Sequence, residues 1–302
     1  MRKFLFAAFG LCALLAAIAF LSLSSAKAAE IRMLKLGILS KLNSTEDEFA
    51  AAWKKTFAPN NENLEVIVRF YESLTAMQMA LSAGEINQMV LPEAAANYLL
   101  SQTQEYEATL NLRSKGAYGL AFGFRADRQD LRDKFNAALS DMRGNWRLAA
   151  LEGRYITAAG KADTEPVKFE KFDGADTLRV AVTGDLPPID FIAADGTPAG
   201  FNTAVLAEIG NALGMNVELI SVESGARTAA LASGRVDVVF WYEVNTAAKI
   251  QADVPDGVIL SEPYYEWNNF IHIKKSYSRS GAASSSGWNV KQSIWELFWP
   301  IE

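Results

Sequence analysis

The chain is poor in the side chains on which many enzymes and metal sites depend. Its 302 residues include one cysteine and one histidine. The cysteine, Cys12, lies in an apolar N-terminal run, so the remainder of the chain has neither a disulfide nor a thiol nucleophile. We find no spacing typical of metal ligands and no glycine-rich phosphate loop. We therefore expect no cofactor, no metal and no enzymatic activity, although a carboxylate base such as Glu93 or Glu243 stays open as an alternative.

The chain also lacks a basic cluster. It has 35 acidic residues against 29 basic ones, which gives a formal net charge of -6. A surface of this sign repels phosphate backbones, so we do not expect nucleic acid as a partner. Because 50% of the residues are apolar or aromatic, a packed core is expected rather than disorder.

The first 29 residues have the order of a secretory signal peptide. A positive start at Met1–Lys3 precedes an apolar run over 4–23, and small residues follow at Ala26 and Ala28. Cleavage there would remove three basic residues, change the net charge to -9, and leave an extracytoplasmic, for example periplasmic, protein. The alternative is a retained anchor, because the apolar run is about long enough to span a bilayer.

Segments typical of strands and helices alternate along the rest of the chain. We expect strands at 34–39, 64–70, 86–91, 118–124, 178–182, 217–222, 236–241 and 270–274. We expect helices at 47–57, 74–83, 93–100, 131–142, 146–155, 202–214 and 227–233, the sixth capped by Asn202 and ended by Gly214. This alternation predicts an α/β fold in which mostly parallel sheets are flanked by helices.

One short pattern occurs twice. Residues 80–87 (ALSAGEIN) and 230–237 (ALASGRVD) both read as a helix end, a glycine in the left-handed conformation and an entering strand. The repeat predicts two related lobes, at 30–157 and 178–275, joined by a polar linker at 158–177. The tail at 276–302 begins rich in serine and glycine, which predicts flexibility, and ends in aromatic residues.

Four motifs in the second half carry a family resemblance: Gly184–Pro188, Asp195–Phe201, Ala230–Asp237 and Ser261–Tyr265. With them, 177–274 resembles the first lobe of the extracytoplasmic solute-binding proteins of ABC transporters, in the family that binds polar amino acids (family 3). Residues 34–156 resemble that family's second lobe. The lobes stand in reversed order. This order resembles a circular permutation, which surface termini tolerate, or a relic of tandem domains that lost their outer parts.

The resemblance implies a two-lobed fold like that of periplasmic binding proteins. It also implies capture of a small polar ligand, most of all an amino acid, and delivery to a membrane ABC permease after hinge closure of the lobes. Two other functions stay open. One is a ligand-sensing or docking module with a degenerate cleft, and the other is a dehydratase-like enzyme on the same scaffold.

A small zwitterion needs a cation for its carboxylate, an acid for its ammonium and apolar walls. Arg227 follows a predicted strand and could hold a carboxylate with two hydrogen bonds, unless it is an exposed residue at a helix start. Lys249 is a less directional substitute, and Glu243 could receive the ammonium or be an ordinary surface acid. The walls are expected from these residues: Asp185, Asp190, Phe191, Trp241 and Tyr242.

The first half contributes further candidates, all near predicted strand ends: Ser44, Thr45, Tyr71, Glu72, Ser73 and Glu93. Ser44 and Thr45 offer hydroxyl groups and a helix N-terminus suited to an anion. A capping box formed with Glu48 would account for them equally well. Glu93 stands beside the proline that occupies the position of the family's ammonium-binding aspartate.

Overall fold

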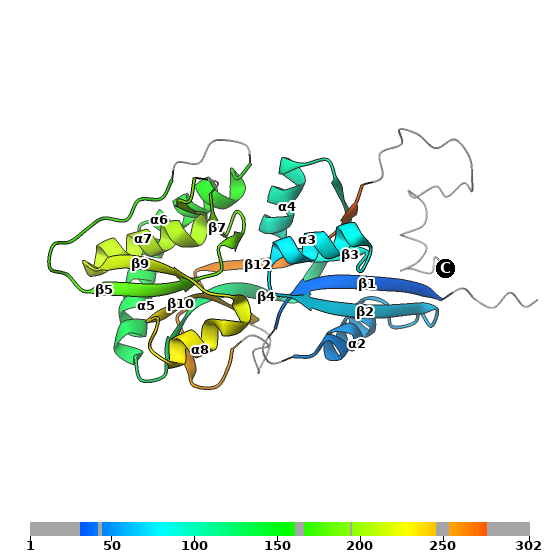
Figure 1. Cartoon of the computed structure of the whole chain (residues 1–302), viewed down its shortest axis with the longest axis horizontal. Coiled ribbons are helices and arrows are strands. Elements are labelled where there is room, and N and C mark those ends of the chain that lie inside the picture. Colours follow the sequence, from blue (N-terminus) through cyan, green and yellow to red (C-terminus); the bar gives the residue numbers. More distant parts are fainter. Residues whose placement is uncertain (1–30, 42–43, 161–165, 194, 246–253, 277–302) are drawn as a thin grey trace, which may run out of the picture.

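The computed structural model describes residues 31–41, 44–160, 166–193, 195–245 and 254–276 (Figure 1). Its main feature is a nine-stranded sheet with the order β2-β1-β3-β12-β4-β10-β5-β9, and β11 pairs with β4. The strands are β1 (Arg32–Leu39), β2 (Leu64–Tyr71), β3 (Gln88–Pro92), β4 (Tyr106–Arg125), β5 (Thr177–Val182), β9 (Asn216–Ser221), β10 (Val238–Asn245), β11 (Val258–Leu260) and β12 (Tyr265–Lys275). A second, small sheet consists of β6 (Asp185–Leu186), β7 (Asp190–Ile192) and β8 (Pro198–Ala199).

The large sheet has two halves, which share two long strands. In the first half, β1 pairs in parallel with β2 and β3. In the second half, β5 pairs in parallel with β9 and β10. Strand β12 runs antiparallel to β3 and β4, and β4 runs antiparallel to β10. We call 31–113 with 269–276 the first half, and 117–267 the second half.

The α/β class predicted from the alternation is confirmed, but the two expected sheets are joined into one. The pairing of β4 with β12 shifts register between Trp267 and Asn269, and this shift marks the junction of the halves. The sequence predicted strands only at 118–124 and 270–274, whereas both strands extend across the junction. Their polar stretches hid this extension, because strands with many polar residues give a weak hydrophobic signal.

Helices cover both faces of the sheet, as Figure 1 shows. In the first half, α3 (Leu74–Ala83) and α4 (Glu93–Gln102) lie on one face, and α2 (Glu46–Phe57) lies on the other. In the second half, α7 (Phe201–Leu213) and α6 (Arg147–Glu152) lie opposite α8 (Arg227–Ala232). Helix α6 runs into a π-helical turn (Gly153–Thr157), and a short 3-10 helix (Ser224–Ala226) precedes α8.

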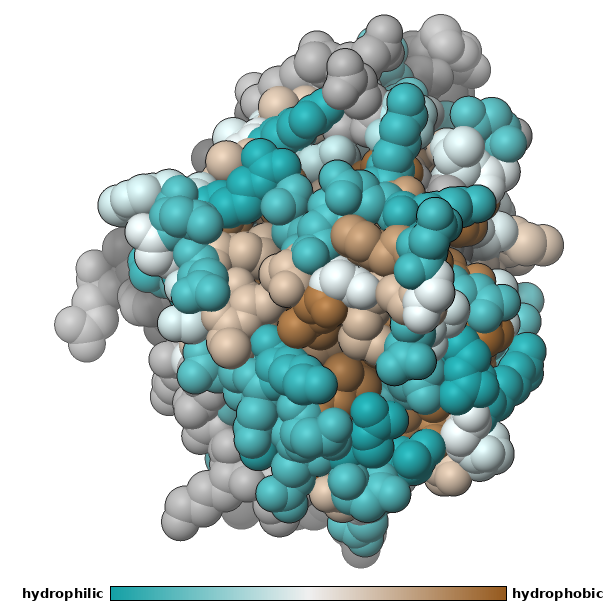
Figure 2. All heavy atoms as spheres, turned by 90° about the vertical axis from the view of Figure 1, so that its left-hand side faces the viewer, coloured by the Kyte–Doolittle hydropathy of each residue, from teal (hydrophilic) through white to brown (hydrophobic). Residues whose placement is uncertain are grey.

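Helix α5 (Gln129–Gly144) and α6 pack against α7, although the predicted division assigns them to the lobe at 30–157. The structure therefore places residues from both sides of the predicted linker in one packed layer. Figure 2 views the outer end of the second half, where hydrophilic side chains cover most of the surface. Most large apolar side chains of this half are buried, among them Phe201, Val205 and Phe240.

The pattern that occurs twice in the sequence forms the same turn in both halves. Gly84 and Gly234 have φ of 78° and 72°, in the left-handed region that glycine adopts without strain. After each turn, the backbone N–H groups fold back to the carbonyl of Ala80 or Ala230. The prediction from the repeated pattern is thereby confirmed at the level of local structure.

The residue that enters each following strand also has the same role. Asn87 Oδ1 accepts a hydrogen bond from the Lys35 backbone N–H at 3.0 Å, and Asp237 Oδ2 accepts one from Arg179 N–H at 3.0 Å. In return, the Asn87 backbone N–H donates to the Lys35 carbonyl at 2.9 Å, and the Asp237 backbone N–H donates to the Arg179 carbonyl at 2.8 Å. Two strands of each half are thus fastened by equivalent side chains.

The start of α7 differs from the prediction. Asn202 does not cap this helix but lies buried inside its first turn, because the helix begins one residue earlier, at Phe201. Gly200 takes the capping position with φ of 101°, and a Cβ there would lie 2.7 Å from the Ile189 carbonyl oxygen. Backbone N–H groups of Phe201 and Asn202 donate to the carbonyls of Pro188 and Ile189, which fixes the helix start. The predicted end at Gly214 is confirmed by its left-handed conformation.

Within the described residues, no helix combines the length and the apolar character needed to cross a membrane. The predicted signal peptide at 1–29 lies outside the described residues, and so does the predicted tail except for its first residue.

Candidate functional site

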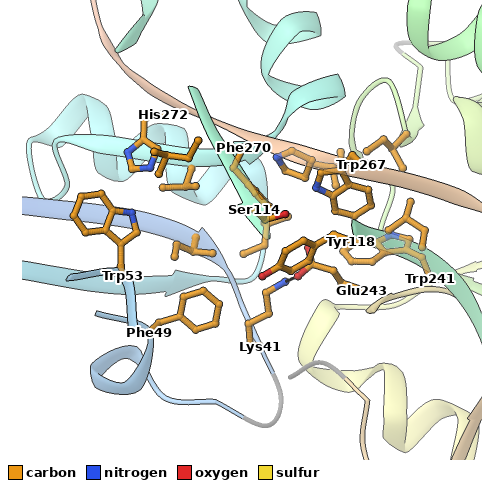
Figure 3. Close-up of a pocket in the computed structure, with 18 of the residues that line it drawn as sticks. Lys41, Phe49, Trp53, Ser114, Tyr118, Trp241, Glu243, Trp267, Phe270 and His272 are labelled. Atoms are coloured by element: carbon orange, nitrogen blue, oxygen red, sulfur yellow. Dashed lines mark hydrogen bonds and ion pairs between the residues drawn. The ribbon is translucent and has the colours of Figure 1, made fainter. Parts of the chain in front are cut away.

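A pocket of about 140 Å³ lies where the two halves of the sheet meet (Figure 3). Its walls come from the ends of β1 and β3, from β4, β10 and β12, and from the inner face of α2. The lining is mostly aromatic or aliphatic: Ile38, Leu39, Lys41, Phe49, Trp53, Phe57, Val90, Pro92, Leu112, Ser114, Tyr118, Leu120, Leu186, Ile189, Trp241, Glu243, Trp267, Phe270 and His272. A concave, largely apolar site with few polar groups is the usual form of a small-molecule site.

One end of the pocket carries an ion pair between the halves. Lys41 Nζ, just after β1, lies 2.6 Å from Glu243 Oε1 on β10, and the two side chains are 7% and 13% exposed. Figure 3 shows both side chains directed toward each other beside Tyr118. Burial and the charge of Glu243 raise the pKa of Tyr118, so its hydroxyl stays protonated at neutral pH. This end of the pocket therefore offers one cation, one anion and one neutral hydroxyl.

The other end of the pocket is aromatic and uncharged. Phe49, Trp53 and Phe57 project from α2, whose start is fixed by a capping box between Thr45 and Glu48. The rings of Trp53 and His272 lie 5.8 Å apart. Burial lowers the pKa of His272 to about 4, so the imidazole is neutral at physiological pH.

Besides the Trp241 indole, which interacts with the Asp190 carboxylate, three nitrogen atoms of the pocket walls are buried and have no hydrogen-bond partner within the described part of the chain. They are Trp53 Nε1, Trp267 Nε1 and His272 Nε2. The second imidazole nitrogen, Nδ1, lies 2.7 Å from Gln88 Oε1. Buried polar atoms are nearly always paired in proteins, so these three atoms are sites where a bound molecule or a water would find a partner.

A second link between the halves lies outside the pocket. Glu72, which follows β2, accepts hydrogen bonds from Ser40 Oγ at 2.7 Å and from the Gly225 backbone N–H at 2.8 Å. Glu72 therefore connects the strand ends of the first half with the 3-10 turn of the second half. Glu72 was a predicted ligand-binding residue, and in the structure it makes this contact between the halves without lining the pocket.

Arg227 has a different environment from the one predicted for a ligand anchor. It is 3% exposed and donates from Nε to the Ser224 carbonyl and from Nη1 to the Trp241 carbonyl, at 3.0 and 2.8 Å. Its guanidinium lies 4.9 Å from the Trp241 ring and 5.0 Å from the Tyr242 ring. Arg227 does not line the pocket, and these contacts hold α8 against β10 behind the pocket wall.

The other candidates of the second half are spread over several environments. Trp241 and Glu243 line the pocket, whereas Tyr242 points to the opposite face of β10 and packs in a separate core cluster. Asp190 is buried and accepts a hydrogen bond from Thr183 Oγ1 at 2.9 Å, while its burial raises the pKa of its carboxyl group. Phe191 contacts Tyr98 across the halves. Lys249 and the side chain of Asp185 lie outside the described residues.

In the first half, most candidates have structural roles. Thr45 and Ser73 cap α2 and α3, and neither lines the pocket; Ser44 precedes the cap, and Tyr71 ends β2 half-buried. Glu93 accepts a hydrogen bond from Asn269 Nδ2 at 2.8 Å and borders a separate, more polar hollow of about 410 Å³ beside α4. The structure therefore brings Glu243 and Trp241 together at the pocket and places the remaining described candidates outside it.

The candidates from the sequence did not include five residues of the pocket lining: Lys41, Trp53, Tyr118, Trp267 and His272. Lys41 carries a signal that was available, since it is a charged residue directly after a predicted strand. Trp53 gave no such signal, because a tryptophan on the apolar face of a helix reads as core. Within the described residues, no group of three potential metal ligands is close enough to hold an ion.

The fold and the pocket define an α/β protein of two related half-sheets with a largely apolar pocket at their junction. Residues 178–281 match the family model of the bacterial extracellular solute-binding proteins, family 3. This match confirms the resemblance that the motifs of the second half indicated. Comparison with curated proteins gave no match.

Several solved structures are similar to this chain at low identity. One is the ligand binding component of an ABC-type import system from Staphylococcus aureus with zinc bound, with 10% identity and a TM-score of 0.43 over 81% of this chain and 66% of that one. Another is the alkanesulfonate-binding protein SsuA from Xanthomonas axonopodis pv. citri bound to MOPS. It has 9% identity and a TM-score of 0.41 over 82% of this chain and 67% of that one. A third is the reduced OxyR regulatory domain from Pseudomonas aeruginosa. It has 10% identity and a TM-score of 0.38 over 83% of this chain and 93% of that one. The chain thus spans about two thirds of the length of the first two proteins.

Proposed function

We propose that the chain is an extracytoplasmic solute-binding protein that captures a small solute in the junction pocket and delivers it to the permease of an ABC importer. The family match of 178–281 supports the class, and the signal-like N-terminal sequence supports the location. The pocket is formed by both halves, so a bound solute would contact both and stabilise one arrangement of them.

The observation that carries the proposal is the buried ion pair between Lys41 and Glu243. These two side chains present the charges that an amino acid needs, a cation for its carboxylate and an anion for its ammonium. An entering amino acid would exchange one ion pair for two, with its side chain in the aromatic part of the pocket. The exchange is energetically accessible, because a buried ion pair contributes little net stability. We therefore assign the ligand to the amino acids, with an apolar or aromatic side chain.

The first experiment is a thermal-shift titration of the protein with apolar and aromatic amino acids. Each amino acid is compared with the amine and the carboxylic acid that lack one of its two charges. We expect a concentration-dependent rise in Tm for an amino acid and a much smaller rise for the singly charged analogues. The absence of a shift with every amino acid would overturn the proposal.

Two variants connect binding to the ion pair. Lys41→Met combined with Glu243→Met replaces the pair by apolar side chains, which usually preserves folding, and we expect affinity to fall by tenfold or more. Glu262→Gln is the matched control, since Glu262 is a 60% exposed acid that pairs with Arg143 away from the pocket. Unchanged affinity in the double variant would contradict a role of the pair in binding.

A specific observation favours a second function, a sensing or docking module. Besides the shared strands, two polar contacts join the halves, at Lys41 with Glu243 and at Glu72 with Gly225. Such links would hold the halves in one arrangement without transport. Small-angle scattering with and without solute separates the two functions, because a transport binder would change its radius of gyration and a docking module would not.

A further inference from the structure

The aromatic end of the pocket has a size and shape that suit one six-membered ring. Phe49, Trp53, Phe57 and Phe270 contribute aromatic walls from α2 and β12. The whole pocket, of about 140 Å³, is close in volume to an engineered protein cavity of about 150 Å³ that binds benzene, so one small ring is the largest group that its aromatic end could take. Aromatic walls favour an aromatic guest, because rings attract each other in stacked or edge-to-face contact.

Buried nitrogen atoms at both ends of the pocket set the polarity of the guest. In Figure 3 the indole nitrogen atoms of Trp53 and Trp267 face the interior of the pocket. Indole nitrogens are donors only. Since both lack an acceptor within the described residues, a purely hydrocarbon guest would leave them unpaired. The guest therefore needs at least one hydrogen-bond acceptor.

His272 adds an acceptor beside the Trp53 donor. Gln88 Oε1 can only accept, so the 2.7 Å contact assigns the imidazole proton to Nδ1. The neutral ring then carries a lone pair on Nε2, which has no partner among the described residues. A hydroxyl group donates one hydrogen bond and accepts another, and it is the smallest group that satisfies a neighbouring acceptor and donor together.

We propose that the aromatic end of the pocket is a subsite for a benzene-sized ring with a hydroxyl group, which bonds to Trp53 Nε1 and His272 Nε2. The proposal rests on the proposed function and names the part of the solute that lies farthest from Lys41 and Glu243. The class of solute is a phenolic compound, and an amino acid with a hydroxyphenyl side chain is one member of this class.

The test uses 4-methylphenol and toluene as probes, because they share a ring and a methyl group and differ in the hydroxyl. Calorimetry of the full chain is expected to give about tenfold tighter binding of 4-methylphenol. In Trp53→Phe, which removes the indole N–H and keeps an aromatic ring, we expect this ratio to fall while toluene binding persists, because the hydroxyl then keeps only its bond to His272 Nε2. The matched control is Trp146→Phe, since Trp146 is 77% exposed and lies outside the pocket.

A second measurement avoids dependence on the folding of the variant. The indole N–H proton signals of the unmodified protein are recorded by NMR, with Trp53 assigned through its variant or, if that variant does not fold, through contacts with the α2 side chains. We expect 4-methylphenol to move the Trp53 signal downfield and toluene to leave it near its starting position. A Trp53 signal that responds equally to both probes would overturn the hydroxyl subsite.

The outcomes separate this proposal from the proposed function. Equal affinity of both probes for the unmodified protein would overturn the hydroxyl, and binding of neither probe would overturn the subsite as a whole. If neither probe binds but an amino acid does, the proposed function stands without the subsite. If no compound binds, both proposals fail.

Discussion

The two halves of the sheet follow one plan but use it differently. Each has two parallel strand pairs, a helix that ends at a left-handed glycine, and a side chain that fastens the next strand, Asn87 in one and Asp237 in the other. In the second half, large side chains fill the layer between helices and sheet. In the first half, α2 lies over the sheet with a small core cluster, and part of the pocket lies beneath it.

The difference shows that the strand plan does not by itself create a binding site. In the second half, Arg227 is held by two carbonyl groups and two rings, so this half presents a rigid wall. In the first half, aromatic residues of α2 stand around a space that they do not fill. The side chains of the helix that covers each half therefore decide whether the space between helix and sheet is filled or forms part of the pocket.

The largest expected difference between the halves is in the free energy of unfolding that is lost when a large buried side chain is replaced by alanine. Phe201 is fully buried against Tyr264 and Tyr265, so Phe201→Ala should lower the free energy of unfolding by about 3–5 kcal/mol. Phe57→Ala removes a ring that borders the pocket, and we expect a loss of about 1–2 kcal/mol. Urea denaturation measures both values. Equal losses would contradict the distinction between a filled half and a hollow one.

The next effect is a loss of stability in mild acid that is caused by His272, a residue of the first half. The folded-state pKa of His272 is lowered to about 4 by burial, so between pH 6.5 and 4 the unfolded chain binds a proton that the folded chain does not. Stability should therefore decrease as pH falls through this window, by about 3 kcal/mol, and then level off below it. His272 is the only histidine, so the difference from His272→Gln isolates its contribution. Parallel pH profiles of the two proteins would contradict this assignment.

A smaller effect compares the equivalent strand-fastening residues. Asp237 accepts from the backbone and the guanidinium of Arg179, and we expect Asp237→Ala to cost about 1–2 kcal/mol. Asn87→Ala loses hydrogen bonds with Lys35 and Met33 and should cost about 1 kcal/mol. Urea denaturation at neutral pH measures both losses.

The same two variants should differ in acid. Burial works to raise the pKa of Asp237, but the hydrogen bonds and charge of Arg179 outweigh it and lower that pKa. The carboxylate therefore contributes stability above its unfolded-state pKa, and this contribution is lost as pH falls through the folded-state value. The loss caused by Asp237→Ala should shrink in acid, while that of Asn87→Ala should not. A pH-independent difference for Asp237 would contradict the role of its charge.

Much of the fold could be predicted because it depends on local signals. Strands in the parallel cores are short apolar runs, and their helices carry explicit ends, such as the capping box at Thr45 and the glycines at 84 and 214. The twice-occurring pattern predicted two related units, and the structure contains the same turn twice. Signals of this kind depend on neighbours within a few residues, so a single sequence is enough to find them.

The site could be predicted only in part because it depends on long-range contacts. Glu243 and Trp241 were found from their place after a strand, but the partner of Glu243 is 202 positions away in the chain. Arg227 also follows a predicted strand, yet its guanidinium bonds to the backbone of β10 and does not line the pocket. Which face a side chain takes at the end of a strand is set by packing between elements, and a single sequence does not reveal that packing.

The position of β12 has a consequence for the order in which the chain acquires its structure. This strand, which begins at Tyr265, lies between β3 and β4 and completes the sheet of the first half. Residues near the N-terminus must therefore wait for residues near position 273 before their sheet can close. Loop closure over such a distance is slow, and the unpaired edge of β3 is exposed in the meantime. The half that starts first along the chain thus depends on the last described strand to close its sheet.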